Sequence, residues 1–277
     1  MNDANFKTLT VSIDNGVAFV TLNHGELNLL DMDMLIDLDR LSREIEVDEA
    51  VKVMVLQSAN PDFFVAHADL GTIATLPSEP APREEVLGWI NQVFDRLRTS
   101  PKVSIAKIQG RARGGGSELA LACDMRFGAI GQAVLGQPEV GVGIIPGAGG
   151  TVRLPRLIGQ GRALEIILGC GDIDAELAER YGYLNRALPA AEIDQFVDNL
   201  ARRIASFPQE ALAAAKASVR FSGSIEEELN HEEIAFLKTV HSEPAKRRMA
   251  AAMGMGMQTP AMEKLCFTDI WGPLADA

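Results

Sequence analysis

Three consecutive glycines, Gly114 to Gly116, stand directly before a run of helix-forming residues from Ser117 to Ala122. Glycine is costly to fix in a folded chain, so this run indicates an unusual turn or the close approach of a ligand. The first N–H groups of a helix have no partner inside it, and they bind anions or a developing oxyanion. Glu118 lies in the first turn, where the helix dipole is expected to lower its pKa and suit it to act as a base. Tight packing of a helix on a strand is the alternative explanation.

The composition is that of an ordinary globular protein, with 277 residues, 47% of them hydrophobic and 23% charged. A net charge of -12 argues against a nucleic-acid partner, which would require a basic face. The sequence has no apolar segment long enough to span a bilayer, and its first residues lack the layout of a secretory signal. We therefore expect a cytoplasmic protein that binds neither nucleic acid nor membrane.

Periodicity predicts an α/β fold in which strands and helices alternate. Asn15-Gly16 favours a tight turn between strands at residues 9–14 and 17–22. A helix capped by Asp31 is expected to bury Met34, Leu35, Leu38, Leu41 and Ile45 and to expose Asp33, Asp37, Arg40 and Glu44. Further strands are predicted at 51–58 and 103–108, an amphipathic helix at 83–98, and loops at 59–68 and 136–151, the second ending at Thr151 as an N-cap.

The C-terminal part of the sequence is predicted to be helical. Helices are expected at 162–168 and 174–181, with Gly182 as the stop of the second, and then at 193–206, 208–221 and 225–253. A composition shift near residue 205 divides a catalytic domain, 1–204, from a C-terminal helical region, 205–277. The apolar surface of that region suits a subunit interface, although packing within one chain explains it equally.

Cysteine and histidine patterns indicate no metal site. Cys123, Cys170 and Cys266 lie far apart, so we expect reduced thiols and neither a disulfide framework nor a zinc site. The chain has only four histidines, and the His231 segment lacks the second histidine of a zinc-protease helix. The glycine-rich segment 147–151 lacks the lysine of a phosphate-binding loop.

Three sequence blocks occur in one order: F-V-A-H-A-D-L at 64–70, the glycine-led segment 110–124, and the segment from G-Q-P-E to Gly150 at 136–150. With these blocks the chain resembles the enoyl-CoA hydratase/isomerase (crotonase) family. The resemblance implies a spiral of ββα units and C-terminal helices that assemble a homotrimer or homohexamer. It also implies an acyl-CoA thioester as ligand, with coenzyme A as part of the substrate and no separate cofactor.

The same resemblance implies roles for individual residues. The backbone N–H groups of Ala68 and Gly115 would form an oxyanion hole for the thioester carbonyl, as fixed donors do. Glu118 would be the base that activates water, and Glu139 the acid that protonates C2, because two carboxyl groups sharing one water can supply both functions. Coenzyme A would be contacted by Ala66, His67, Asp69, Leu70 and Gly114.

Four features depart from the family pattern. His67 replaces a glycine and is either an additional acid–base group or a side chain directed away from the ligand. Gly71 stands where some hydratases have a lysine for the CoA phosphates, which leaves Arg111 or Arg113 as candidates for that contact. Arg113 itself replaces a leucine, and a solvated or salt-bridged arginine is the alternative. The segment 253–277 does not follow the family's usual ending.

The sequence thus favours an enoyl-CoA hydratase that adds water across a C2=C3 double bond. The alternatives are an enoyl-CoA isomerase, another family reaction such as thioester hydrolysis or dehalogenation, and a protein that binds CoA esters without turnover. Retention of both glutamates favours hydration.

Overall fold

A computed structural model describes residues 6–74, 88–220, 222 and 242–255. Its centre is a six-stranded sheet in the order β1-β2-β3-β5-β7-β10. Only the first pair is antiparallel, and its turn at Asn15-Gly16 has positive φ angles, which confirms the predicted hairpin. The strands are β1 (Leu9–Asp14), β2 (Val17–Leu22), β3 (Val53–Ser58), β5 (Val103–Ile108), β7 (Met125–Ala129) and β10 (Arg186–Leu188).

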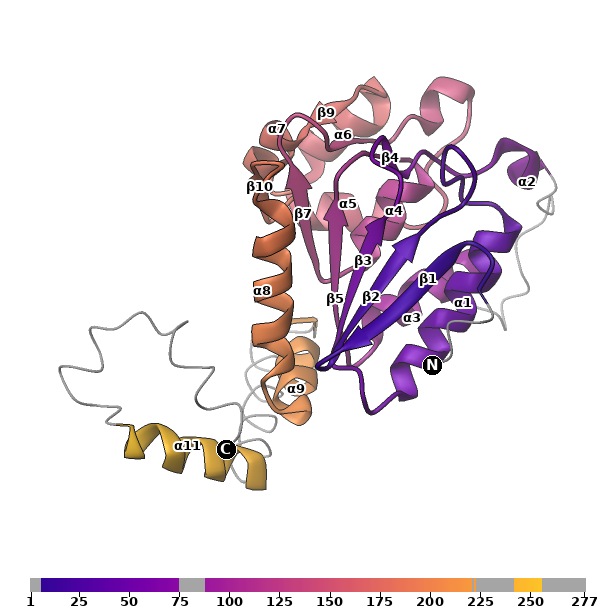
Figure 1. Ribbon diagram of the computed structural model, residues 1–277. Coiled ribbons are helices and arrows are strands. Elements are labelled where there is room, and N and C mark those ends of the chain that lie inside the picture. Colours follow the sequence, from indigo (N-terminus) through magenta and orange to yellow (C-terminus); the bar gives the residue numbers. More distant parts are fainter. Residues whose placement is uncertain (1–5, 75–87, 221, 223–241, 256–277) are drawn as a thin grey trace.

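Helices cover both faces of this sheet because consecutive strand residues point in opposite directions. On β3, Val53 and Val55 pack against α8 (Ile193–Ala205). Met54 and Leu56 face the larger core, which α1 (Met32–Val47), α3 (Trp89–Thr99) and α4 (Gly115–Ala122) complete. Figure 1 shows α8 on one side of the strands and α1 and α3 on the other. The result is a three-layer arrangement.

A second sheet consists of four short strands in the order β4-β6-β8-β9. Three of them are parallel to one another, and β9 is antiparallel to β8. The predicted loop at 59–68 therefore contains a strand, β4. The members are β4 (Phe63–Val65), β6 (Arg111–Arg113), β8 (Val134–Gly136) and β9 (Ile173–Asp174).

The chain repeats one pattern three times, a long strand followed by a short strand of the second sheet and then a helix. The units run β3-β4-α2, β5-β6-α4 and β7-β8-α5, where α2 is Leu70–Ala74 and α5 is Gly150–Ile158. In the last unit a short 3-10 helix, η2 (Glu139–Val142), comes before α5. This repeat confirms the predicted spiral of ββα units. It also gathers the segments that follow β4, β6 and β8, because these three strands lie side by side.

Three sequence expectations about the helices need correction. Asp37 of α1 is buried and not solvated, because its carboxylate accepts hydrogen bonds from the backbone N–H groups of Lys7 and Thr8. Thr151 lies inside α5, and Gly149 occupies the N-cap position. The amphipathic helix expected from residue 83 begins at Trp89, with Gly88 as its N-cap, and ends at Thr99; residues 83–87 lie outside the described part of the chain.

The C-terminal elements are helical, as expected. After α6 (Gln160–Gly169) and α7 (Ala175–Tyr181), which ends at Gly182, come α8, α9 (Gln209–Arg220) and α11 (Glu243–Gly254). Residues 225–241 of the predicted last helix lie outside the described residues. In Figure 1, α11 lies apart from the body of the molecule. The boundary at residue 205 stays a prediction.

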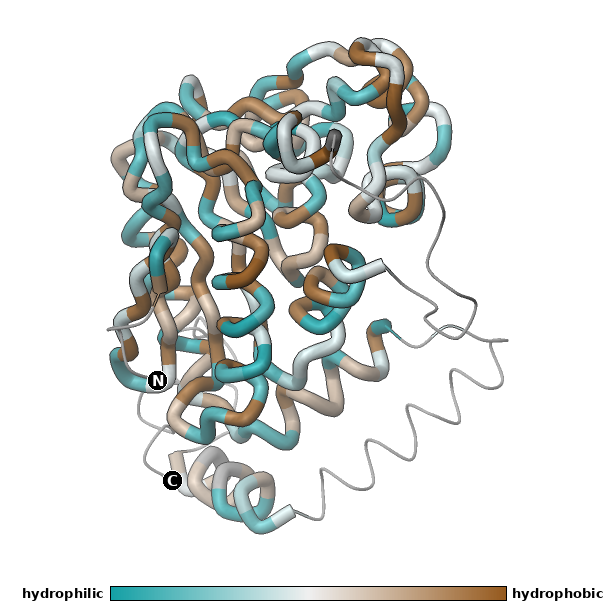
Figure 2. Tube along the Cα trace, turned by 90° about the vertical axis from the view of Figure 1, so that its right-hand side faces the viewer, coloured by the Kyte–Doolittle hydropathy of each residue, from teal (hydrophilic) through white to brown (hydrophobic). Residues whose placement is uncertain are grey.

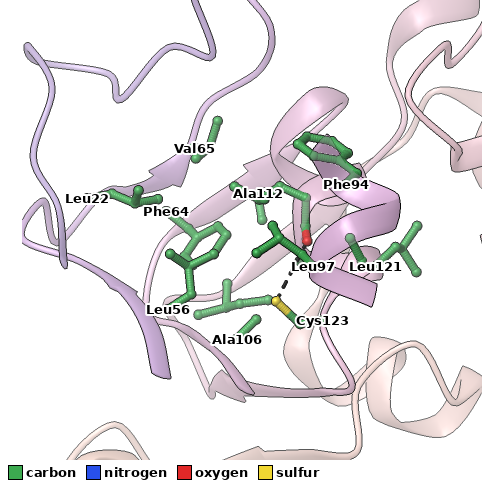
Figure 3. Close-up of a cluster of buried hydrophobic side chains, with 14 of the residues drawn as sticks. Leu22, Leu56, Phe64, Val65, Phe94, Leu97, Ala106, Ala112, Leu121 and Cys123 are labelled. Carbon is green, nitrogen blue, oxygen red and sulfur yellow. Dashed lines mark hydrogen bonds between the residues drawn. The ribbon is translucent and has the colours of Figure 1, made fainter. Parts of the chain in front are cut away.

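One cluster of buried side chains joins both sheets to α3 and α4. Figure 3 shows Leu56, Phe64 and Leu97 among the side chains packed around Cys123, whose thiol contacts the carbonyl of Leu119. Cys123 is buried, Cys170 is partly buried, and both are free thiols; Cys266 lies outside the described residues. Polar and apolar residues alternate along most of the trace (Figure 2), as expected where each element buries one face.

Candidate active site

The glycines before α4 allow two other segments to approach its first turn. A methyl group on Gly115 would lie 2.9 Å from Leu30 Cδ2 and 3.4 Å from the amide nitrogen of Ala68. A methyl group on Gly116 would lie 2.3 Å from the carbonyl oxygen of Val65, closer than any side chain can come. Close approach is therefore the reason for these glycines, and it brings the segment after β4 onto the start of the helix.

Two backbone N–H groups at this contact have no hydrogen-bond partner among the described residues. Ala68 forms a single parallel bridge with Leu30, in which the carbonyl of His67 and the N–H of Asp69 bond to Leu30, both at 3.0 Å. The N–H of Ala68 consequently points to the opposite side, toward Gly115. Gly115 is the first residue of α4, and its N–H has no partner within the helix. That these two donors bind one oxygen atom of a ligand stays a prediction.

Glu118 is buried in the first turn of α4, with 3% of its surface exposed. Its Oε1 accepts hydrogen bonds from the N–H groups of Ala148 (2.8 Å) and Gly150 (2.7 Å). Burial raises the pKa of this carboxyl, while the two amides and the charge of Arg153 act in the opposite direction. The expected lowering of its pKa by the helix dipole is therefore wrong, because the loss of hydration has the larger effect.

Glu139 begins η2 and reaches the other side of the same turn. A methyl group on Gly114, which has a φ of 49°, would lie only 2.7 Å from Glu139 Oε1. Burial, together with the charge of Glu118, raises the pKa of Glu139 to about 7. The two carboxyl groups therefore interact electrostatically in one site, and one of them changes its charge near neutral pH.

Gln137 lies between the two carboxyl groups, and the sequence did not single it out. A methyl group on Gly150 would lie 3.0 Å from Glu118 Oε1 and 3.0 Å from the end of the Gln137 amide that faces Ser117. With its nitrogen directed at Glu139, the Gln137 amide donates to both carboxylate oxygens at 3.2 Å, and its oxygen accepts from Ser117 Oγ at 3.3 Å. This orientation satisfies both ends of a fully buried amide.

Tyr183, which comes directly after the end of α7 at Gly182, extends this hydrogen-bond network. Its hydroxyl contacts Ser117 Oγ, and burial raises the pKa of Tyr183 to about 12, so the hydroxyl stays protonated. A directed chain results in which Tyr183 donates to Ser117, Ser117 to Gln137, and Gln137 to Glu139. Gln137 and Ser117 could have been suspected because each is within two positions of a predicted glutamate, whereas no sequence signal marks Tyr183.

The residues predicted to contact coenzyme A lie along the chain between β4 and α2. Ala66 is buried and Leu70 is exposed, while Asp69 accepts from the N–H of Thr72 and so caps α2. The ring of His67 is partly buried, and its Nδ1 contacts the carbonyl of Ala68 at 2.9 Å. Gly114 forms the N-cap of α4 beside them. This segment thus borders the two free N–H groups, while its contacts with coenzyme A stay a prediction.

Of the two arginines considered for phosphate binding, Arg113 pairs with Asp172 through two hydrogen bonds. The salt-bridged alternative for Arg113 is therefore confirmed. Arg111 places its guanidinium 5.8 Å from the centre of the Phe63 ring.

The His/Cys/Asp/Glu side chains of the described residues form no group of three that could hold a metal ion. None of the described helices is long and apolar enough to cross a membrane.

The fold and the site together define a class: a ββα-spiral protein in which two interacting carboxyl groups lie around a helix start that two amide donors border. Residues 12–264 match the sequence pattern of the family described as enoyl-CoA hydratase/isomerase. The chain belongs to the enoyl-CoA hydratase/isomerase family.

Individual relatives agree with this assignment. The chain is 37% identical to the short-chain-enoyl-CoA hydratase of Clostridium acetobutylicum over 85% of its own length and 90% of that protein's. It is 34% identical to the crotonyl-CoA hydratase of Syntrophomonas wolfei over 77% of its length and 81% of that protein's. The crystal structure of an enoyl-CoA hydratase from Bacillus anthracis superposes with a TM-score of 0.83 at 32% identity, covering 90% of this chain and 97% of that one.

Proposed function

We propose that this protein is an enoyl-CoA hydratase, which adds water across the C2=C3 double bond of a 2-enoyl-CoA thioester. The observation that supports the proposal is that the N–H groups of Ala68 and Gly115, which have no partner in the described part of the chain, lie near the carboxyl groups of Glu118 and Glu139. Two relatives named as hydratases, at 37% and 34% identity, support the same activity.

The two N–H groups stabilise the charge that develops on the thioester oxygen as water attacks C3. They are suited to this because backbone donors are held in place before the reaction begins. Loss of one such donor typically costs about 3 kcal/mol of transition-state stabilisation. The oxygen of water becomes bonded to C3, and a proton is delivered to C2, which together make the 3-hydroxyacyl thioester.

The surroundings of the two glutamates support different roles. Glu118 is held by two backbone amides and faces the charge of Arg153, which favour the carboxylate that a base requires. Glu139, with its pKa raised to about 7, carries a proton over part of the neutral range and can donate it to C2. We assign Glu118 as the base and Glu139 as the acid. Ala66, His67, Asp69, Leu70 and Gly114 are the proposed contacts for coenzyme A.

Hydration of crotonyl-CoA, followed by the loss of enoyl-thioester absorbance, tests the proposal. Glu118→Gln and Glu139→Gln keep the side-chain shape and remove the acid–base function, so each is expected to lower kcat by about a hundred- to ten-thousand-fold. A loss of less than tenfold in both variants would count strongly against hydration. A β,γ-unsaturated acyl-CoA, assayed with the same variants, separates hydration from the isomerase activity that the family also includes.

We also propose that the chain assembles as a homotrimer, or as a homohexamer built from two trimers. The C-terminal helices support this because they expose apolar side chains: Val219 of α9 is 87% exposed, and Met249 and Met253 of α11 are 47% and 53% exposed. Such residues are buried when a helix packs on a partner. Light scattering on the protein as it elutes from a size-exclusion column gives the mass of the assembly directly. A monomer would contradict the proposal.

A further inference from the structure

A cavity of about 440 Å³ lies between α3 and α5, on the outer side of the loop that holds Glu118. This volume is within the usual range for small-molecule sites. Its walls come from one face of α3, from the first turns of α5 and from the loop between η2 and α5. The charged and polar side chains at the wall are Asn91, Asp95, Arg98, Thr151, Arg153 and Arg156.

The charges lining this cavity do not balance. Among the described residues that line it, three guanidinium groups face one carboxylate, that of Asp95, which lies 2.6 Å from Arg98 Nε and 3.8 Å from Arg153. Arg156 donates to the carbonyl of Val152 in its own helix and forms no ion pair with any carboxylate in the described part of the chain. A local excess of positive charge attracts anions.

The partial burial of Arg153 strengthens the effect of this excess of positive charge. Arg153 is partly buried, and burial lowers its pKa, as do the neighbouring charges of Arg98 and Arg220. Asp95 and Glu118 act in the opposite direction. An anionic group that entered the cavity would relieve the repulsion among the guanidinium groups, and it would interact strongly because part of the surrounding water is excluded.

The cavity shares its inner wall with the active site. Gly147 and Gly149 line the cavity, while the alternate residues Ala148 and Gly150 donate their N–H groups to Glu118. Asn91 at the cavity wall donates to the carbonyl of Gly147 at 3.0 Å. A ligand in the cavity is therefore separated from the catalytic carboxylate by a single layer of backbone.

We propose that this cavity binds an anionic oxygen group of the substrate; where that group belongs to the acyl chain, the cavity selects acyl-CoA thioesters with an acidic chain end. This inference rests on the proposed function, because it extends the same substrate beyond the reacting carbons. Two parts of an acyl-CoA supply the required chemistry, a carboxylate at the far end of the acyl chain or a phosphate of coenzyme A. Guanidinium groups bind both through paired N–H···O bonds.

The test compares matched thioesters that differ only in the terminal group. The first pair is trans-2-pentenoyl-CoA and the 2-enoyl-CoA of the corresponding five-carbon dicarboxylic acid; a second pair has six carbons. Each is assayed with the wild-type protein, Arg98→Gln and Arg156→Gln. Arg180→Gln, which replaces an exposed arginine on α7, is the matched control. The same acyl groups are also assayed as thioesters of pantetheine, which lacks the nucleotide phosphates.

If the anion is an acyl carboxylate, wild-type kcat/KM for the acidic thioester exceeds that of its neutral counterpart, and each variant lowers this ratio by about tenfold. If it is a phosphate, each variant lowers kcat/KM equally for both CoA thioesters and has no effect on the pantetheine thioesters. Unchanged kcat/KM in both variants with every thioester overturns the inference. Failure of the wild-type protein to hydrate any thioester overturns the proposed function instead, and calorimetric titration of Arg156→Gln with the acidic thioester then still tests the cavity.

Discussion

The two glutamates of the site have the same side chain and opposite supports. Glu118 stands on a helix in which every residue is buried, and two backbone amides hold its carboxylate. Glu139 stands on a short 3-10 turn in which no residue is fully buried, and a side-chain amide, Gln137, holds it. Backbone donors keep their place under most substitutions, whereas a side-chain donor is lost in one. The position of the Glu118 carboxyl group is thus held by the main chain, and that of Glu139 depends on one replaceable side chain.

Glycine-to-alanine substitutions should displace the two carboxyl groups one at a time, and they should have the largest effects on kcat. Gly114→Ala places a methyl group 2.7 Å from Glu139 Oε1 at a φ of 49°, and Gly150→Ala places one 2.7 Å from Pro146 Cβ and 3.0 Å from Glu118 Oε1. Displacement of a catalytic group by about 1 Å lowers kcat by about a hundredfold. Gly161→Ala, where no atom lies within 4 Å of the added methyl, is the control. Equal activity of all three variants would show that neither carboxylate has a catalytic position.

The pH dependence of kcat/KM should show whether Glu139 is the group that changes its charge near neutral pH. If Glu139 is the acid, it must be protonated, so activity is expected to fall about tenfold per pH unit above a pKa of about 7. Glu139→Gln should remove this limb from the residual activity. A rate that rises through pH 7 would instead make Glu139 the base and reverse the assignment.

Removal of one hydroxyl from the Tyr183–Ser117–Gln137 chain should have a smaller effect. Tyr183→Phe keeps the ring and removes the donor to Ser117, so the Gln137 amide is free to turn its oxygen toward Glu139. Without a donor the carboxylate is less stable, and the alkaline limb should move to higher pH with about a few-fold change in kcat. Ser117→Ala should match it. A lower rate with an unmoved limb would indicate a packing role only.

The smallest expected effect is on stability. The pKa of Glu139 is raised from 4.5 to about 7 in the folded protein, so the unfolded chain ionises first as pH rises. Folding therefore loses stability between about pH 4.5 and 7, and the loss persists above this window. Because the group is partly exposed, a discounted value is about 1 kcal/mol. Glu139→Gln should raise Tm by about 2–4 °C at pH 8 and by less near pH 4.5; equal shifts at both pH values would contradict this.

Local patterns in the sequence were sufficient to predict much of the fold. The hairpin at Asn15-Gly16, the helix capped by Asp31 and the strand Val103–Ile108 are confirmed because short-range periodicity and turn chemistry determine them. The second sheet was missed because its strands have two or three residues, too few for a period to show. Asp37 was misplaced because its partners, Lys7 and Thr8, come from a distant segment.

The candidate site was predicted in part for the same reason. The four principal residues lie in recognisable blocks, and the structure brings them together. The burial that raises the pKa of Glu118, and the orientation of Gln137 set from Tyr183, depend on contacts across the fold that no local pattern encodes.

The two hydrogens proposed to bind the thioester oxygen, at Ala68 beside its bridge to Leu30 and at Gly115, belong to the main chain. Exchanging the side chain at residue 68 would leave its amide in place. The ability to withdraw electrons from a thioester is therefore hard to lose by point mutation, whereas the fate of the activated intermediate depends on replaceable side chains. Divergence from this scaffold toward new reactions should accordingly begin at the carboxyl groups and their neighbours, with activation of the thioester inherited unchanged.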